Sequence, residues 1–296
     1  MALITQIIGI MFPIVAIVAI GWGLGRASTL NMDTPNRLNL DVFVPALVFS
    51  SLSDKSYDLA PHLSLAVAGL AIVLIAGAIA WLIAASSQYS FRTIGPPMMF
   101  HNAGNVGLPI MSLAFGKPGL VIGLVLFLVG NLTHYGLGTY ILSPGKGMKV
   151  MLRQAVIWAA VIAIIINVSP VTISEKVMLP VTMLGQIAIP LMLFSLGVRI
   201  ANIDFQEWKT GLIFAFLTPL VGFVIAFILV LLFEFSSIQA GSLLLFGALP
   251  PAVMNFLFAE RFNQQPHSVA SIVLLGNLLA MLTLPLALAY VLTNYS

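Results

Sequence analysis

The sequence contains no cysteine, which excludes disulfide bonds, thiolate chemistry and cysteine-ligated metal sites. Charged residues are also scarce, since Asp, Glu, Lys and Arg together make up 7% of the 296 residues. The nine acidic residues lie mostly in loops and form no carboxylate pair for acid–base catalysis. Metalloprotease, serine-hydrolase and nucleotide-binding motifs are missing as well. We therefore expect no enzyme activity and no resident metal or cofactor.

Apolar residues take the place of the missing charge: 60% of the chain is hydrophobic, and its mean hydropathy is +1.10. A soluble domain of this size needs more polar surface, so the composition predicts an integral membrane protein. Most apolar runs reach about 20 residues, enough for an α-helix to cross roughly 30 Å of hydrocarbon. The twelve basic residues are scattered over loops, so the high pI does not indicate a nucleic-acid partner.

The apolar runs predict ten membrane-spanning helices joined by short loops. They cover about residues 6–25, 37–52, 61–84, 94–116, 119–142, 150–168, 177–198, 211–233, 238–259 and 267–292. Loops after even-numbered spans hold Lys55, Lys117 and Lys176, whereas the other nine of the twelve basic residues follow odd-numbered spans (12 − 3 = 9). The positive-inside rule then places the odd loops in the cytoplasm and both termini outside. The predicted location is the plasma membrane or the bacterial inner membrane, surrounded by lipid.

Two short motifs recur at nearly the same distance along the chain, which indicates an internal repeat. VFVPALVFS returns as IAIPLMLFS, so that Pro45 corresponds to Pro190 (190 − 45 = 145). LVGNL returns as LLGNL, so that Asn131 corresponds to Asn277 (277 − 131 = 146).

The repeat divides the chain into halves, residues 1–143 and 144–296, with five predicted spans each. Because five is odd, the second half would enter the membrane from the opposite side. We therefore predict two inverted five-helix repeats, an architecture of many secondary transporters. An offset of 146 pairs Pro109 with Asn255 (255 − 109 = 146). A rival register aligns the Pro-Pro dipeptides of the two halves instead.

The fourth predicted span contains the polar stretch FHNAGNVGLPI. Gly104 and Gly107 weaken a helix, and Pro109 removes a backbone N–H and clashes with the carbonyl four residues earlier. We predict that the helix breaks here and that a second half-helix starts near Pro109, with its free N–H groups facing a water-filled cavity. Asn102 and Asn105 would add amide groups beside the break. The alternative is a proline kink capped by asparagines.

The ninth predicted span is interrupted too, because GALPPAVMNFLFAE places two prolines and then Asn255 in mid-membrane. Interrupted helices at corresponding positions of two halves are the best sequence pointer to a transporter site. The carboxylate of a substrate would lie on the half-helix N-termini near Pro109 and Asn255. The predicted substrate-binding residues are Asn102, Asn105, Gly107, Pro109, Pro251 and Asn255.

Three ionisable side chains are candidates for proton coupling. Asp41 is the only carboxylate placed within a predicted span, and an acid inside the membrane is a functional candidate by default. Arg37 lies four residues earlier and could instead form a structural ion pair with it. His101 beside the break and His134 in the fifth span could carry protons, or stay neutral and bonded to neighbouring helices. Sodium, if used, would be held by carbonyl and amide oxygens around the breaks.

Other polar residues have both a binding and a structural interpretation. Asn131 and Asn277 either face the substrate or act as hydrogen-bonding glue between helices. Gln186 and the serines at 50 and 195 would line the wall opposite the breaks. The predicted supporting residues are Pro45, Ser50, Asn131, Gln186, Pro190, Ser195 and Asn277.

Three stretches resemble the auxin efflux carrier family of plant PIN carriers and bacterial permeases: NRLNLDVFVPALVFSSL, NAGNVGLPI and ALPPAVMNFLFAERFNQQP. The resemblance covers essentially the whole chain. It implies ten helices in two inverted repeats with crossed, broken helices 4 and 9, as in sodium/proton antiporters and bile-acid symporters. Spans 1, 2, 6 and 7 would form a scaffold that dimerises through spans 2 and 7. Spans 3–5 and 8–10 would form a moving transport domain.

The same resemblance implies carriage of small organic anions, either auxin or dicarboxylates such as malate and malonate. Asn255 stands where plant carriers have proline, and their long central loop is missing here, which argues against auxin itself. We predict a secondary transporter or facilitator for such an anion, working by alternating access in the direction of efflux. The alternatives are a sodium-coupled symporter of an amphipathic anion and a membrane receptor that binds without transporting.

Overall fold

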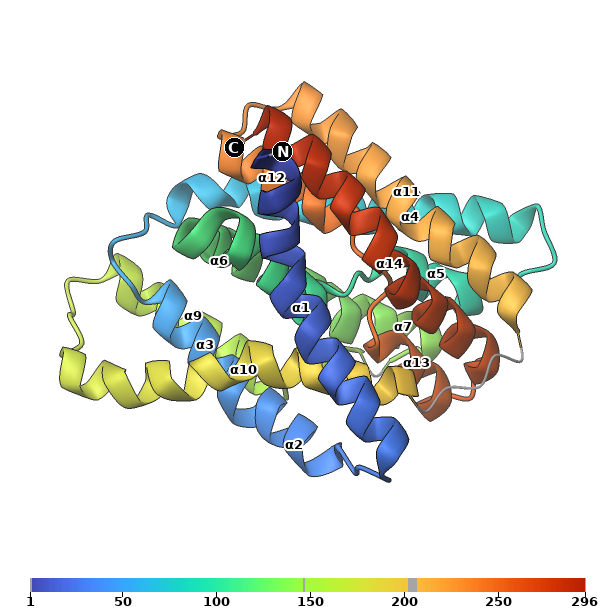
Figure 1. Ribbon diagram of the computed structural model, residues 1–296. Helices are drawn as coiled ribbons and strands as arrows, with labels where there is room; N and C mark the ends of the chain where they lie inside the picture. Colours follow the sequence, from blue (N-terminus) through green and yellow to red (C-terminus); the bar gives the residue numbers. More distant parts are fainter. Residues whose placement is uncertain (1, 146, 202–206, 296) are drawn as a thin grey trace.

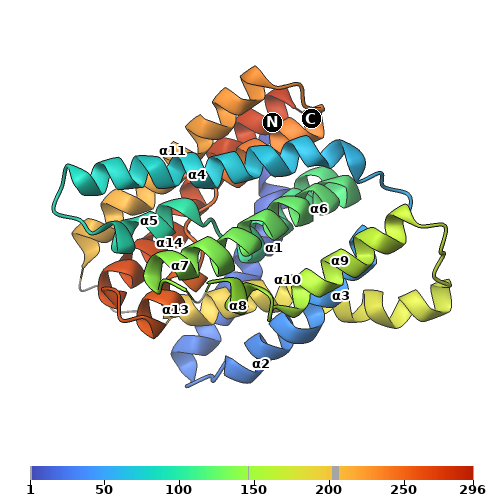
Figure 2. The ribbon, with the colours of Figure 1, turned by 180° about the vertical axis from the view of Figure 1, so that it is seen from behind.

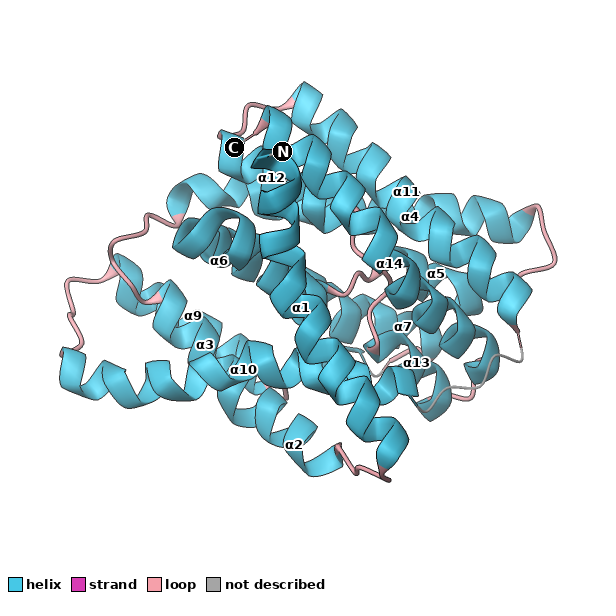
Figure 3. Cartoon of the chain, in the orientation of Figure 1, coloured by secondary structure: helices cyan, strands magenta, loops and turns pink. Residues whose placement is uncertain are grey.

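The computed structural model describes residues 2–145, 147–201 and 207–295, and in these ranges the chain folds into helices joined by loops (Figure 3). No strand occurs there apart from one isolated bridge between His101 and Pro251. The predicted all-α class is therefore confirmed for the described residues. Lys146, one of the basic residues assigned to odd-numbered loops, lies outside them.

Six helical segments of the described chain are long and apolar enough to cross a membrane (Figure 1). They are α1 (Ala2–Ala27), α4 (Leu63–Ala85), the run Ala103–Leu142, α10 (Glu175–Ala201), α11 (Trp208–Leu232) and α14 (Pro266–Asn294). Two shorter apolar helices are α9 (Ala155–Val168) and α12 (Ser237–Gly247). The chain is thus a multi-pass helical membrane protein.

The run Ala103–Leu142 joins what the sequence predicts as parts of two spans. It consists of η3 (Ala103–Gly107), α6 (Leu108–Thr133), η4 (His134–Gly138) and α7 (Thr139–Leu142). Within α6, Gly116 has φ 65° and ψ −148°, a conformation that residues with a Cβ rarely adopt. Gly116 therefore separates two helical segments, as the predicted loop between residues 116 and 119 requires. The second segment folds back on the first, since a Cβ on Gly123 would lie 3.3 Å from the Leu108 side chain.

The second predicted span is also longer than expected. It comprises α2 (Asp33–Leu38), η1 (Asn39–Phe43) and α3 (Val44–Leu52) without interruption. The helix begins at Asp33, four residues before the start predicted at about residue 37, and the Asn31 side-chain oxygen accepts from the Asp33 N–H at 2.8 Å. The shorter helices are η2 (Ala60–His62), α5 (Phe91–Met99), α8 (Gly147–Met151) and α13 (Met254–Arg261).

The helices pack mainly in two groups, which we call the front group and the back group. In the front group, α1 packs along α10, and α3 packs against α9 and α10 (Figure 1). In the back group, α11 packs along α14 and α12, while α4 packs against α5 and α6 (Figure 2). Contacts of α10 with η3, and of α1 with α6 and α14, connect the two groups.

The contact between α1 and α10 is made by glycines on both helices. A Cβ atom on Gly21 would collide with the Phe194 carbonyl, and one on Gly197 would collide with the Val18 carbonyl. Gly25 continues this close face one turn further along α1, in the spacing Gly21-x-x-x-Gly25. Small residues at this spacing let membrane helices approach backbone to backbone.

Candidate functional site

The two interrupted helices meet at their breaks. α5 and α12 are each followed by a short extended segment, and the two segments pair antiparallel. The Asn102 N–H donates to the Pro250 carbonyl at 2.7 Å, and the Ala252 N–H donates to the Phe100 carbonyl at 2.8 Å. Unpaired backbone groups in hydrocarbon cost several kcal/mol each, so these bonds allow both helices to break inside the protein. Both predicted interruptions are present.

The first break lies before the predicted position at Gly104–Pro109. The helix resumes at Ala103 in η3, a π-helical turn that runs on into α6. In this wide turn the Gly107 N–H bonds to the Asn102 carbonyl, five residues earlier, at 3.1 Å. The wider register relieves the clash that Pro109 would make in an α-helix. The prediction that the helix breaks at Gly104–Pro109 is therefore wrong, whereas the α-helix itself resumes at Leu108 with Pro109 in its first turn, as predicted.

Side-chain amides lock the paired segments in place. The Asn277 amide nitrogen donates to the Pro251 carbonyl at 3.0 Å, and its oxygen accepts from the Asn102 amide at 2.7 Å. The Asn255 amide donates to the Phe100 carbonyl at 3.0 Å, so a side chain of the second half also holds the break of the first half. These three asparagines are all buried, and the bonds from Asn255 and Asn277 satisfy backbone carbonyls at the two breaks.

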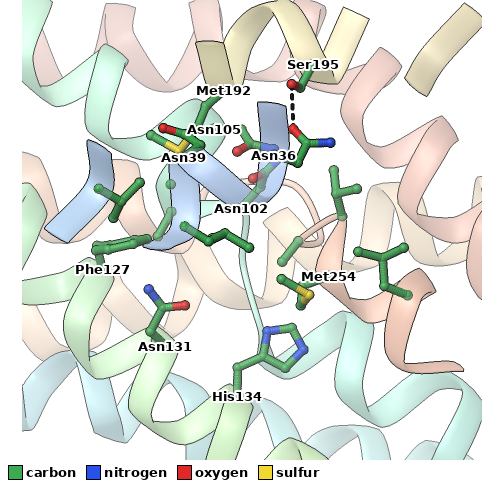
Figure 4. Close-up of a pocket in the computed structure, with 18 of the residues that line it drawn as sticks. Asn36, Asn39, Asn102, Asn105, Phe127, Asn131, His134, Met192, Ser195 and Met254 are labelled. Carbon is green, nitrogen blue, oxygen red and sulfur yellow. Dashed lines mark hydrogen bonds between the residues drawn. The ribbon is translucent and has the colours of Figure 1, made fainter. Parts of the chain in front are cut away.

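A cavity of about 400 Å³ lies beside the crossing and opens between the two helix groups (Figure 4). Asn39, Asn105 and Met192 lie on one side of it, and Asn131 and His134 on the other. Five asparagines line it, which are Asn36, Asn39, Asn102, Asn105 and Asn131. Its charged lining residues are Asp33, Arg37, Asp41 and Arg199. We call this space the central cavity.

Both half-helices that restart after the breaks begin at the wall of the central cavity. η3 begins at Ala103, and α13 begins at Met254. Among the described residues, none accepts a hydrogen bond from the backbone N–H of Gly104, Asn105, Val253 or Met254, and all four line the cavity. Free N–H groups and the positive end of the helix dipole favour a negative charge at such a place.

The predicted site residues divide between the central cavity and its surroundings. Those that line the cavity are Asp41, His101, Asn102, Asn105, Asn131, His134 and Ser195. Those outside its lining are Pro45, Gly107, Pro109, Pro190, Pro251, Asn255 and Asn277. Ser50 and Gln186 line a second cavity instead. Of the symmetric pair, Asn277 is held by hydrogen bonds, whereas Asn131 is half-buried in the cavity wall.

The two histidines of the site are buried among aromatic rings. His134 stacks on Phe100 with a ring-centroid distance of 4.3 Å and meets Phe258 edge-on at 5.0 Å. His101 meets Phe246 edge-on at 5.5 Å, and neither of its ring nitrogens has a hydrogen-bond partner among the described residues. Both ring nitrogens are buried, and Nε2 lies beside Gly222 on α11, where an added Cβ would come within 2.9 Å of it.

Asp41 forms the ion pair predicted from its spacing with Arg37. The Arg37 Nε and Asp41 Oδ2 atoms are 3.5 Å apart, and the two side chains are 86% and 59% exposed. An ion pair this exposed contributes little to stability. The structure thus places Asp41 at the rim of the central cavity, not in a buried part of the membrane span.

Three residues that line the central cavity, Asn36, Asn39 and Arg199, were not predicted, because they lie in helices without a break. Asn36 accepts a hydrogen bond from Ser195 Oγ at 2.6 Å, and the Asn39 amide donates to the Ala188 carbonyl at 3.4 Å. Their spacing of three residues, which puts them on one face of a helix, was the available sequence signal. Arg199 carried no such signal, since a basic residue at a helix end normally marks membrane sidedness.

A second cavity of about 500 Å³ lies toward the other ends of three helices that also line the central cavity. In α3, Val44 lines the central cavity and Leu47 the second one. In α10, Met192 lines the central cavity and Gln186 the second one. In α6, Phe127 lines the central cavity while Leu120 and Val121 line the second. The protein between the cavities is thin.

Comparisons with known proteins agree on a transport family. Residues 6–154 and 148–288 match the family described as membrane transport protein. The chain is 24% identical to the uncharacterized transporter YfdV of Escherichia coli (strain K12) over 292 residues, which cover 88% of this chain and 90% of YfdV. It is 25% identical to an uncharacterized transporter of Methanothermobacter thermautotrophicus over 285 residues, with 89% and 90% covered.

Proposed function

The chain belongs to the auxin-efflux-carrier-like membrane transport protein family, and we propose that it is a secondary transporter that carries a small organic anion through the central cavity. The observation that supports this most is the meeting of two half-helix N-termini at the cavity wall. Four residues whose backbone N–H groups have no acceptor in the described chain line a space of about 400 Å³. That volume falls within the usual range for small-molecule sites.

The mechanism we propose is alternating access between two inverted five-helix repeats, residues 1–143 and 144–296. The front group of helices would be the scaffold, which dimerises through the second and seventh spans, and the back group would be the moving domain. The grouping of helix contacts supports this division. The two cavities at opposite ends of α3, α6 and α10 support a cycle in which the site faces each side in turn.

In the proposed cycle the carboxylate of the anion lies against Gly104 and Asn105 on one side and against Val253 and Met254 on the other. Asn131 offers a further amide from the opposite wall. Asn102 and Asn255 do not bind the anion through their side chains in this proposal, because their amides hold the paired segments in place. His101, with two unpartnered ring nitrogens, is the proposed proton carrier.

Transport is tested by uptake of labelled malate, malonate and indole-3-acetate into proteoliposomes, with and without pH and sodium gradients. We expect saturable flux of one anion, lowered at least about tenfold by Asn105→Ala, since the side chain of Asn105 lines the cavity and has no other partner in the described residues. Sodium dependence of that flux would identify the symporter alternative. Binding without flux would identify a receptor, and equal flux through both proteins would refute the proposed site.

The absence of cysteine makes a single-cysteine test of sidedness direct. With both termini outside, the central cavity faces the cytoplasm and the second cavity faces outward. We expect Asn105→Cys to react with a membrane-impermeant thiol reagent added to the cytoplasmic side, and Ser50→Cys to react with reagent added outside. Saturating anion should protect the first and not the second. The reverse sidedness would contradict the proposed topology.

A further inference from the structure

Arg199 stands where the central cavity meets a third cavity. The third cavity has a volume of about 530 Å³ and is lined by residues of α2, α10, α13 and α14. Arg199, Asp33 and Asn36 line both spaces. Arg199, near the C-terminal end of α10, is half-buried and lines both cavities. A ligand in the central cavity therefore has a fixed cation within its walls.

The charge of Arg199 is only partly balanced by the protein. The carboxylates that act on it are those of Asp33 on α2 and Glu260 on α13. Neither carboxylate lies within 4.0 Å of the Arg199 guanidinium nitrogens as an ion pair in the described part of the chain. A half-buried guanidinium without a close counterion gains more from an added carboxylate than an exposed one.

A hydrogen bond between α10 and α2 fixes the helix face that carries Arg199. Ser195, one turn before Arg199 on α10, donates from its hydroxyl to Asn36 at 2.6 Å. Asp33 lies three residues before Asn36, on the same face of α2. The hydrogen bond thus fixes the face of α10 that carries Arg199 toward α2 and the cavity mouth. Glu260 approaches from α13, which packs against α14 in the back group.

We propose that Arg199 is the cation that pairs with the carboxylate of the transported anion, and that Glu260 and Asp33 compete with the anion for it. The proposal rests on the proposed function and names the residue that gives that site its charge preference. Under this proposal, anion binding requires the positive charge of Arg199 in addition to the half-helix N-termini. Weakening the cation should weaken anion binding, and removing a competing carboxylate should strengthen it.

The test is the KM and kcat of anion uptake in proteoliposomes, for malate, malonate and indole-3-acetate. We expect Arg199→Gln to raise KM about 10- to 100-fold, the loss expected for a charged hydrogen-bonded pair, with a smaller effect on kcat. Arg199→Lys should recover part of the loss, because it keeps the charge without the planar fork. Glu260→Gln should lower KM about threefold, since it removes one competing charge. Arg261→Gln, an exposed arginine beside Glu260 that lines none of the three cavities, should change neither constant.

An unchanged KM in Arg199→Gln, or a raised KM in Glu260→Gln, would overturn the proposal while wild-type flux leaves the transport function standing. If the wild-type protein shows no flux, the Kd of each anion is measured by calorimetry on the detergent-solubilised protein and the same variants. Opposite shifts of Kd in Arg199→Gln and Glu260→Gln would then support the role of Arg199 in a protein that does not transport. Binding of none of the three anions by the wild type would overturn both proposals.

Discussion

Replacing Asn277 by leucine is expected to abolish transport and to lower the unfolding midpoint in detergent by about 10 °C. The substitution removes two bonds that join the break to α14, one to the Pro251 carbonyl and one from the Asn102 amide. Both partners remain buried and unpaired, at a cost of about 1–3 kcal/mol each. A loss of roughly 3 kcal/mol lowers the midpoint of a protein this large by several degrees. Thermal unfolding and uptake are measured on the same preparation.

The matched control for Asn277→Leu is Asn131→Leu, at the corresponding place in the LVGNL motif. Asn131 lines the central cavity and has no side-chain hydrogen bond among the described residues, so its loss should leave the unfolding midpoint within about 2 °C. Anion uptake should fall in both variants. Equal loss of stability in the two would contradict the different roles that the structure gives them.

Replacing Gly197 by leucine is expected to prevent α1 from packing on α10 and to leave little monodisperse protein in detergent. A Cβ at this position collides with the Val18 carbonyl and also comes within 2.8 Å of the Trp22 backbone nitrogen. Side chains can shift but two helix backbones cannot, so the helices must separate. Overpacking of this kind costs about 1–3 kcal/mol even where side chains can adjust. The yield of monodisperse protein in size-exclusion chromatography measures the effect.

Gly23 provides the control for Gly197 on the same pair of helices. It lies on α1 between Gly21 and Gly25, and a Cβ there would meet nothing within 4 Å. Gly23→Leu should therefore give normal yield and an unfolding midpoint near that of the wild type. A similar loss in both variants would mean that the close contact of α1 and α10 does not limit folding.

The positions of the breaks show what hydrophobic pattern can and cannot predict. Gly and Pro in an apolar run indicate that a helix is disturbed, and both disturbed helices were predicted correctly. The break itself lies at Phe100–Asn102 because two residues there, Phe100 and Asn102, form backbone hydrogen bonds with the segment that interrupts the other helix. Pro109, the residue that most strongly predicts a break, follows a π-helical turn and does not interrupt the helix. The position of the break thus depends on the pairing of two segments that are 150 residues apart in the sequence, at His101 and Pro251 (251 − 101 = 150). A local sequence pattern does not contain that information.

The candidate site was only half predictable for the same reason. Asn102 and Asn105 are close to a local break and were found, whereas Arg199 and Asn36 reach the cavity from ordinary helical segments. Asn131 and Asn277 have equivalent sequence contexts, yet one faces the cavity and the other holds the crossing. No local pattern separates them, because the difference depends on which helix each one meets.

The thin layer between the central and second cavities determines how an applied voltage acts on the protein. Leu47 comes three positions after Val44 (47 − 44 = 3), and Met192 comes six positions after Gln186 (192 − 186 = 6). At 1.5 Å per helical residue, these are roughly 5 to 9 Å, against about 30 Å of hydrocarbon. With water in both cavities, most of the electric field falls across that layer. A singly charged anion displaced by only a few ångströms then crosses most of the voltage, which is worth about 2.3 kcal/mol per 100 mV.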